Sequence, residues 1–182
     1  MPLKPGTVIA RRGQLVIRTV RASDVRPLHA HIAALVQERA QILMQHVPTL
    51  SEEKAFVRSA LADLRSGKGI LLVAEWEGEI AGVSGAHRAM VKAHATGHIA
   101  MLGIAVGSRF RRKGVGKALL REAMRLAREQ WSTRVFWLDV YRTNAAARRL
   151  YRKMGFRVTG QIPNGARVRG KVTDVLLMVK GS

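Results

Sequence analysis

The sequence contains no cysteine, few aromatic residues and no long apolar run. Without cysteine, the protein can have neither a disulfide framework nor a thiol nucleophile. No apolar stretch approaches the about 20 residues that a membrane-spanning helix needs, and the first residues lack the apolar segment of a signal peptide. We therefore expect a cytoplasmic protein that has no membrane partner.

Acidic residues are also scarce, with 12 Asp and Glu against 32 Lys and Arg, which gives a formal net charge of +20. Residues 101–182 carry 19 of these cations but only 4 of the acidic residues. Such a charge attracts polyanions, so nucleic acid or the ribosome is one class of expected partner. A general preference for arginine in the composition explains the charge equally well. Few aromatic residues are present to stack on bases.

The length of 182 residues and the 47% of hydrophobic residues are typical of one folded domain. Residues 1–14 are expected to form a flexible N-terminal extension. No repeat or Gly/Ser-rich linker interrupts the remainder. Residues 15–182 are therefore expected to form a single domain.

Apolar periodicity changes several times along this domain, between alternation typical of strands and spacing typical of helices. Two strands form a predicted hairpin with its turn at Glu77-Gly78-Glu79, and an apolar strand at 97–106 is expected to be buried on both faces. The predicted elements are strand 15–20, helices within 22–44 and 47–69, two strands within 70–90, strand 97–106, helix 117–131, strand 134–140, helix 144–154, and strands 156–160 and 173–179. This order, β-α-α-β-β-β-α-β-α-β-β, predicts an α/β (α+β) fold with helices on the faces of a mixed sheet.

The stretch "FRRKGVGKALL" (110–120) lies between the apolar strand and the following helix. Its glycines bracket a helix N-terminus, where unpaired backbone N–H groups and the helix dipole bind anions. The residues concerned are Gly114, Val115 and Gly116, with Arg111, Arg112, Lys113 and Lys117 supplying positive charge around them. The pattern predicts a phosphate-binding loop, and a tight turn with solvated cations is the structural alternative.

Two other phosphate motifs do not fit. A P-loop needs Ser or Thr after its lysine, and Lys117 is followed by Ala118. A dinucleotide-binding fingerprint needs a third glycine where this chain has Leu119. If the loop is functional, the remaining interpretation is a binding site for the pyrophosphate of acetyl-CoA.

Arg111-x-x-Gly114-x-Gly116 closely resembles the acyl-CoA signature of the GCN5-related N-acetyltransferase (GNAT) family. Downstream, "NAAARRLYRKMGF" (144–156) resembles the second conserved block of that family. The resemblance covers residues 15 to about 179. It implies a mostly antiparallel sheet of about 7 strands with helices on both faces, splayed between the strands around 98–106 and 135–140.

The resemblance implies an acyltransferase that moves the acetyl group of acetyl-CoA to a primary amine by direct attack, without a metal. The family motifs assign the backbone of Ile104, Ala105 and Val106 to the pantetheine arm of the cofactor. They assign residues 111–117 to the pyrophosphate. They further assign Asn144 to the cofactor, and Tyr151 to the cofactor and to protonation of the departing thiolate. From sequence alone, Asn144 is equally a helix cap and Tyr151 a core aromatic residue.

The base that deprotonates the amine is not apparent. Some GNAT members carry a carboxylate on the strand before the loop, where this chain has Ala100. His98 would share a strand face with that position, and an imidazole titrates in a suitable range. Glu75 on an adjacent strand and Asp139 beside the splay are the other candidates.

The acceptor is also open. The C-terminal hairpin carries Arg167, Arg169 and Lys171, which would repel polycations and favour a carboxylate. A small-molecule amine such as an amino acid is therefore the expected acceptor. The alternatives are a protein amine, ribosomal or N-terminal, or a non-catalytic protein that binds acyl-CoA or nucleic acid. The oligomeric state stays open, a homodimer included.

Overall fold

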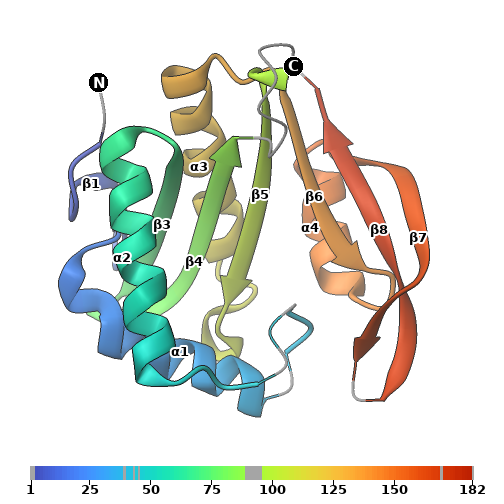
Figure 1. The fold of residues 1–182 in the computed structure, drawn as a ribbon, viewed down its shortest axis with the longest axis horizontal. Helices are drawn as coiled ribbons and strands as arrows, with labels where there is room; N and C mark the ends of the chain where they lie inside the picture. The colour runs from blue at the N-terminus through green and yellow to red at the C-terminus, as the bar shows by residue number, and fades with distance from the viewer. Residues whose placement is uncertain are drawn as a thin grey trace.

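The computed structural model describes residues 3–38, 40–42, 44, 46–88, 96–168 and 170–181. One eight-stranded sheet, in the order β1-β2-β3-β4-β5-β6-β8-β7, carries helices on both faces (Figure 1). The strands are β1 (Val8–Arg12), β2 (Leu15–Thr19), β3 (Gly69–Trp76), β4 (Glu79–Arg88), β5 (Ile99–Val106), β6 (Val135–Tyr141), β7 (Arg157–Val168) and β8 (Lys171–Lys180). The helices are α1 (Val25–Gln37), α2 (Leu50–Ser66), α3 (Val115–Trp131) and α4 (Ala145–Lys153), with 3₁₀ helices η1 (Ala22–Asp24) and η3 (Ser108–Phe110). This is the predicted mixed α/β order, extended by one strand.

The extra strand corrects the expectation for residues 1–14. Strand β1 pairs antiparallel with β2 at the edge of the sheet, and the Thr7 amide donates to the Thr19 hydroxyl at 2.9 Å. The strand is short, and its outer positions are exposed and end in two arginines. An edge strand of this kind carries little of the apolar alternation by which strands are found in a sequence.

Helices α1 and α2 cover one face of the first half of the sheet, and α3 covers the other face (Figure 1). Helix α2 begins with a capping box in which the Thr49 hydroxyl accepts from the Glu52 amide at 3.2 Å. The helix lies within the predicted segment 47–69. Helix α1 ends at Gln37, earlier than predicted, so a long connection leads from α1 to α2.

Strand β3 is buried on both faces because α2 and α3 sandwich it: Leu71 and Val73 face α2, while Ile70 and Leu72 face α3. The same prediction for β5 is wrong. Its face toward α3 is buried, but Gly103 on the other face is exposed. Helices α1 and α2 pack over β4 and β3 and leave that face of β5 uncovered.

Strands β5 and β6 are parallel, and they pair only where Ile99–Met101 meets Val135–Trp137 among the described residues. Beyond Met101, β5 keeps its ladder to β4 while β6 pairs along its length with β8. The two strands therefore diverge toward their carboxyl ends (Figure 1). The splay that the resemblance implied is confirmed.

The last two strands form a longer hairpin than the sequence predicted. Residues 161–168 lie between the two predicted strands of the C-terminal hairpin, and in the structure they continue β7, with an irregularity in the pairing between Ile162 and Ala166. Pro163 and Asn164, whose φ is +53°, lie in this irregularity. A proline within a strand is typical of edge strands and bulges.

Candidate functional site

The open edge of β5 presents two residues to the divergence between β5 and β6. The Gly107 amide donates to Ala81 O at 3.0 Å, which fixes the antiparallel alternation against β4. Because hydrogen-bonded pairs alternate along such a ladder, Ile104 and Val106 direct their N–H and C=O groups away from β4. The backbone of Ala105 faces β4 instead. Of the three residues predicted to contact a pantetheine arm, two have their backbone on the open edge.

The loop after β5 leaves a run of backbone amides unpaired. The first helical bond of α3 runs from the Ala118 amide to Gly114 O at 3.0 Å. In the described part of the chain, the amides of residues 112–117 donate to no backbone carbonyl. Arg112 and Gly114 have left-handed φ values of +63° and +83°, and left-handed residues among successive amides are typical of anion-binding concavities. The loop therefore has the donors that a pyrophosphate needs.

The two glycines of the loop have different reasons to be glycine. At Gly114 the positive φ disfavours a side chain, and no atom lies within 4 Å of where a Cβ would stand. At Gly116 a Cβ would lie 3.2 Å from Leu150 Cδ2 and 3.3 Å from Ile104 Cδ1. Gly114 thus leaves open space beside the amides, whereas Gly116 lets α3 approach β5 and α4 closely.

Two of the four loop cations are engaged away from the amides. Arg111 donates through Nε to Val106 O at 3.0 Å and forms an ion pair with Glu38, at the end of α1. Lys113 Nζ lies over the rings of Trp76 and Phe110, at 5.1 and 5.7 Å from their centroids. Arg112 and Lys117 are exposed and make no such contact among the described residues. The fixed part of the cradle is therefore backbone.

Tyr151 comes from α4, on the β6 side of the divergence. Its side chain is 5% exposed and packs against Phe156, with ring centroids 6.0 Å apart. Burial, and then the negative charge of Asp139, raise the pKa of the hydroxyl far above its usual value. The hydroxyl has no hydrogen-bond partner among the described residues. Tyr151 is thus a core residue whose hydroxyl stays protonated at neutral pH.

Asn144 caps α4, as one reading of the sequence held. Its Oδ1 accepts from the Ala147 amide at 3.1 Å, and its Nδ2 donates to Gln41 O at 3.3 Å. A cofactor that binds the Asn144 side chain would have to share Oδ1 or Nδ2 with these partners, or displace Gln41.

His98 and Glu75 are not brought to the open end of β5. His98 is exposed in the turn before β5, and its carbonyl accepts from Val135 N at 3.1 Å, at the closed end of the strand pair. Ile104 and Val106 lie six and eight positions further along the chain, at about 3.3 Å per residue. His98 therefore lies at the end of β5 opposite to the one where Ile104 and Val106 have open backbone groups.

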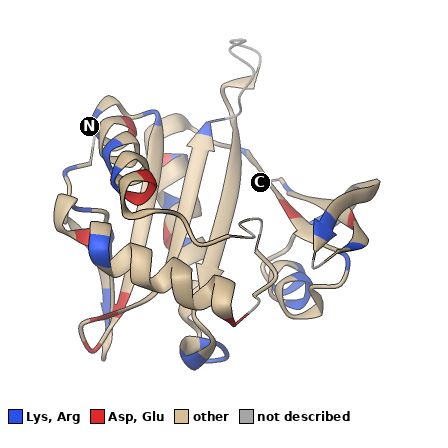
Figure 2. Ribbon diagram, turned by 60° about the horizontal axis from the view of Figure 1, so that its bottom comes forward, with Lys and Arg blue, Asp and Glu red and all other residues tan. Residues whose placement is uncertain are grey.

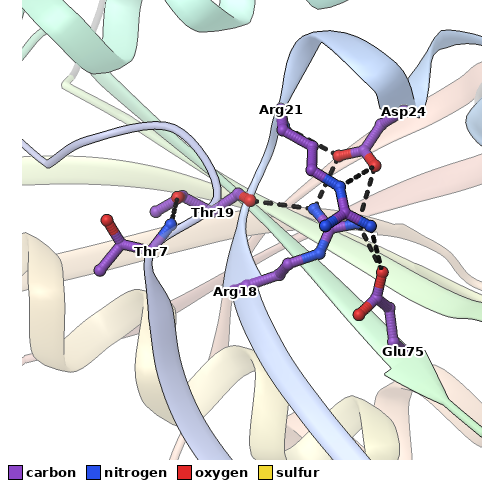
Figure 3. A network of polar contacts seen from close by, with 6 residues as sticks. All are labelled: Thr7, Arg18, Thr19, Arg21, Asp24 and Glu75. Carbon is purple, nitrogen blue, oxygen red and sulfur yellow. Dashed lines mark hydrogen bonds and ion pairs between the residues drawn. The ribbon is translucent and has the colours of Figure 1, made fainter. Parts of the chain in front are cut away.

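Glu75 belongs to an ion-pair network between β2 and β3 (Figure 3). Its carboxylate accepts from Arg18 at 2.6 Å and from Arg21 at 3.1 Å, and Asp24 binds Arg18 through two bonds of 2.7 Å. Arg18 is 2% exposed. The carboxylate of Glu75 is thus engaged by two guanidinium groups between β2 and β3.

Asp139, the third candidate, lies on β6 and contributes to the raised pKa of Tyr151. It forms no ion pair among the described residues. Of the three carboxylate and imidazole candidates, Asp139 is the one that the structure brings within electrostatic reach of Tyr151.

The connection from α1 to α2 contacts both sides of the divergence through its described residues. Glu38 contacts Arg111 on the β5 side, while Ile42 O accepts from the Tyr141 hydroxyl at 3.2 Å at the end of β6. Loop residues without periodicity give no signal of such contacts, so the sequence could not have placed them.

None of the described helices combines the length and apolar character that crossing a membrane requires. Among the described residues, no three His, Asp or Glu side chains gather as ligands of a metal ion would.

Comparisons with known proteins agree with this geometry. L-amino acid N-acetyltransferase AaaT of Escherichia coli (strain K12) is 32% identical over 83 residues, which are 46% of this chain. The chain spans about half (51%) of the length of that relative.

Solved structures match over nearly the whole chain. An acetyltransferase of the GNAT family from Streptococcus pneumoniae is 30% identical and covers 92% of this chain and 99% of its own, with a TM-score of 0.80. RimL, a ribosomal L7/L12 alpha-N-protein acetyltransferase solved with coenzyme A, shares the fold with a TM-score of 0.82, at 18% identity, over 96% of this chain and 98% of its own. The Acetyltransferase (GNAT) family profile matches residues 36–156, and the chain therefore belongs to the GNAT acetyltransferase family.

Proposed function

We propose that this protein transfers the acetyl group of acetyl-CoA to the primary amine of a small molecule, an amino acid or a related compound. Two stretches of backbone carry the proposal: the open strand edge at Ile104 and Val106, and the unpaired amides of residues 112–117. An open strand edge followed by an anion cradle fits an extended amide arm attached to a diphosphate. Family membership supports the same reading.

The residues present fit the cofactor. In this proposal the Ile104 amide and carbonyl and the Val106 amide bind the pantetheine amides, and residues 112–117 bind the pyrophosphate. Val106 O already accepts a hydrogen bond from Arg111 Nε at 3.0 Å. The Arg111 side chain therefore holds the strand edge at Val106 in place. Arg112 and Lys117 are the cations free to add charge to the pyrophosphate site.

Acetyl-CoA, when bound, supplies the acetyl group as a thioester. The chain must then handle two protons. Tyr151 donates one to the departing sulfur, and its raised pKa keeps that proton in place at neutral pH. Asp139 accepts the proton of the amine, directly or through water, because a free amine with a pKa near about 10 is protonated at neutral pH. Both side chains come from the β6 side of the divergence.

The acceptor would approach over the uncovered face of β5, where Gly103 is exposed. Arg167 and Lys171 are exposed on the neighbouring hairpin, and Arg169 lies outside the described residues. Their positive charge favours an acceptor that carries a carboxylate. The similarity to an L-amino acid N-acetyltransferase supports the same class of acceptor.

Initial rates of thiol release from acetyl-CoA across amino acids, polyamines, aminoglycosides and peptides would test this proposal. We expect amino acids to give the highest kcat/KM. A preference for polyamines would refute the charge argument. No thiol release with any amine, together with tight coenzyme binding, would show a binding protein and refute the enzymatic proposal.

Acetylation of a ribosomal protein is the second candidate function. The observations that favour it are the shared fold with a ribosomal protein acetyltransferase and the net charge of +20. A peptide with the N-terminal sequence of a ribosomal protein, used in the same assay, separates the two candidates. This second function requires the peptide to exceed every free amino acid in kcat/KM.

A further inference from the structure

A groove of about 630 Å³ runs along α3 on the face of the sheet away from α1 and α2. Helix α3 forms one wall, and the ends of α4 and β8 form the other. The lining holds one carboxylate, Glu129, and the six cations Lys117, Arg121, Arg125, Arg128, Lys153 and Lys180. Basic residues outnumber acidic ones by 32 to 12 in the whole chain, and Figure 2 marks both kinds on the ribbon. None of the groove's lining residues has a role in the proposed acetyl transfer except Lys117, at the end nearest the loop.

The cations on α3 follow a regular spacing. Lys117, Arg121, Arg125 and Arg128 occupy successive turns and so form one stripe. The stripe is about 16 Å long at 1.5 Å per residue. One strand of a nucleic acid duplex places a phosphate about every 3.4 Å of axis, so the stripe can face roughly five phosphates.

The groove keeps an excess of positive charge after its internal ion pairs are counted. Arg125 binds Glu122 at 2.9 Å and Glu129 at 2.6 Å, and Arg121 binds Glu122 at 3.1 Å. These two carboxylates face six cations. Lys153 has no ion pair among the described residues, and it is exposed.

Arg128 shows how a cation of the groove is held without a carboxylate. Its guanidinium lies 4.8 Å from the centroid of the Phe136 ring. Such a stacked guanidinium keeps its N–H donors in its own plane, available to an oxygen ligand. Arginine held in this way suits phosphate oxygens, which accept two parallel bonds from it.

The far end of the groove is separate from the proposed cofactor site. Arg128 lies about 16 Å along α3 from Lys117, which is itself the first-turn residue beside the amide cradle. Lys153 ends α4 and Lys180 ends β8. A ligand that binds Arg128, Lys153 and Lys180 therefore does not need to contact the loop at 111–116.

We propose that this α3–α4 groove binds the phosphodiester backbone of a nucleic acid. Its lining carries no aromatic side chain for stacking and no Asn or Gln for reading bases. Contacts made by Lys and Arg alone go to phosphates and carry no sequence information. Binding is therefore independent of sequence and strongly dependent on salt. The inference stands apart from the identity of the acetyl acceptor.

Fluorescence anisotropy with a labelled 20-base-pair RNA duplex, and with a DNA duplex of the same sequence, tests the proposal between 50 and 200 mM salt. The test variant is Arg128→Gln/Lys153→Gln. The matched control is Lys54→Gln/Arg58→Gln, which removes the same charge from exposed positions of α2 on the opposite face. Lys153→Gln alone provides a milder variant should the double change lower the melting temperature.

We expect a slope of log K against log salt of about −4 for the wild type, since each phosphate contact contributes about −0.9. The double variant should weaken binding at 0.1 M salt about 60-fold, at about eightfold per contact, while the control stays within threefold. Binding of both duplexes supports the phosphodiester backbone as the ligand. A preference for one duplex shows whether RNA or DNA is the nucleic acid bound.

Three results would overturn the proposal. The control variant could lose as much affinity as the groove variant, which would assign binding to net charge alone. Polyglutamate could compete as well as RNA at equal charge, which would indicate an acidic protein partner. The groove variant could lose affinity for coenzyme A in parallel by calorimetry, which would make the groove part of the cofactor site.

Discussion

Two polar regions of the molecule differ in how completely their groups are paired. Next to β2 and β3, Arg18 donates to both Asp24 and Glu75 through bonds of 2.6–2.7 Å (Figure 3). Along the divergence between β5 and β6, the amides of residues 112–117 and the Tyr151 hydroxyl have no partner in the described chain. Paired groups stabilise the fold, whereas unpaired groups at an open edge are available to a ligand. Changes in the first region should therefore alter stability, and changes in the second should alter binding and turnover.

The largest expected effect comes from filling the space beside the amides. Gly114→Glu places a side chain at a φ of +83° and a negative charge where the diphosphate would bind. We expect coenzyme A binding, measured by calorimetry, to weaken by more than a hundredfold. Gly13→Glu is the matched control, because Gly13 also has a positive φ and open surroundings, on the β1–β2 turn. Equal loss in both variants would mean that the loop has no special part in binding.

Removal of one hydroxyl tests the second group at the divergence. Tyr151→Phe keeps the ring against Phe156 and removes the proton that we assign to the leaving sulfur. We expect kcat to fall by about 10²–10⁴-fold, with the dissociation constant for coenzyme A and the melting temperature nearly unchanged. Stopped assays with acetyl-CoA and the best amine would measure this.

Tyr141→Phe is the control for that experiment, since Tyr141 is the other tyrosine of the chain. It loses the bond to Ile42 O, at a cost of about 1 kcal/mol, and should keep kcat within tenfold. If Tyr151→Phe turned over at the wild-type rate, the hydroxyl would not be the proton donor.

In the paired region, Arg18→Met should lower the free energy of unfolding by about 3–5 kcal/mol, because it leaves Asp24 and Glu75 with the half-exposed Arg21 as their remaining cation. Urea denaturation would measure the change, and coenzyme binding by the remaining folded protein should persist. Arg109→Met is the control: its partner Glu79 and Arg109 itself are mostly exposed, so its cost should be under about 1 kcal/mol. A smaller loss for Arg18→Met than for Arg109→Met would contradict the comparison.

The smallest effect concerns pH. Burial lowers the pKa of His31 below its usual value, against smaller opposing contributions from a bond with the Ile80 backbone and from Glu38. The unfolded chain then binds the proton more readily, so the folded state loses stability as pH falls through the usual histidine range. Denaturation between pH 7 and pH 5 should show this loss, and His31→Asn should reduce it.

Much of the candidate site could be predicted because each of its two motifs lies within one short stretch of the chain. The glycines at 114 and 116 and the block 144–156 depend on local backbone geometry, which the sequence records directly. The base could not be located in this way. Glu75 and His98 are plausible residue types, but their roles depend on contacts with distant residues and on which end of a strand they occupy.

The fold shows the same limit. The apolar residues of β5 predict a strand that is buried on both faces. Whether the second face is buried depends on where α1 and α2 pack. Strand β1 gives a weak pattern because an exposed edge needs little apolar surface. The contact of Glu38 with Arg111 joins residues 73 positions apart, and no local pattern reports such a pair.

The central claim is that backbone amides after β5 bind the diphosphate of the cofactor. A titration of ¹⁵N-labelled protein with coenzyme A, followed through its amide resonances, tests this most directly. We predict that the signals of residues 112–117 and of Ile104 shift the most and saturate together. Saturating shifts confined to other residues, or no shifts at all, would contradict the account.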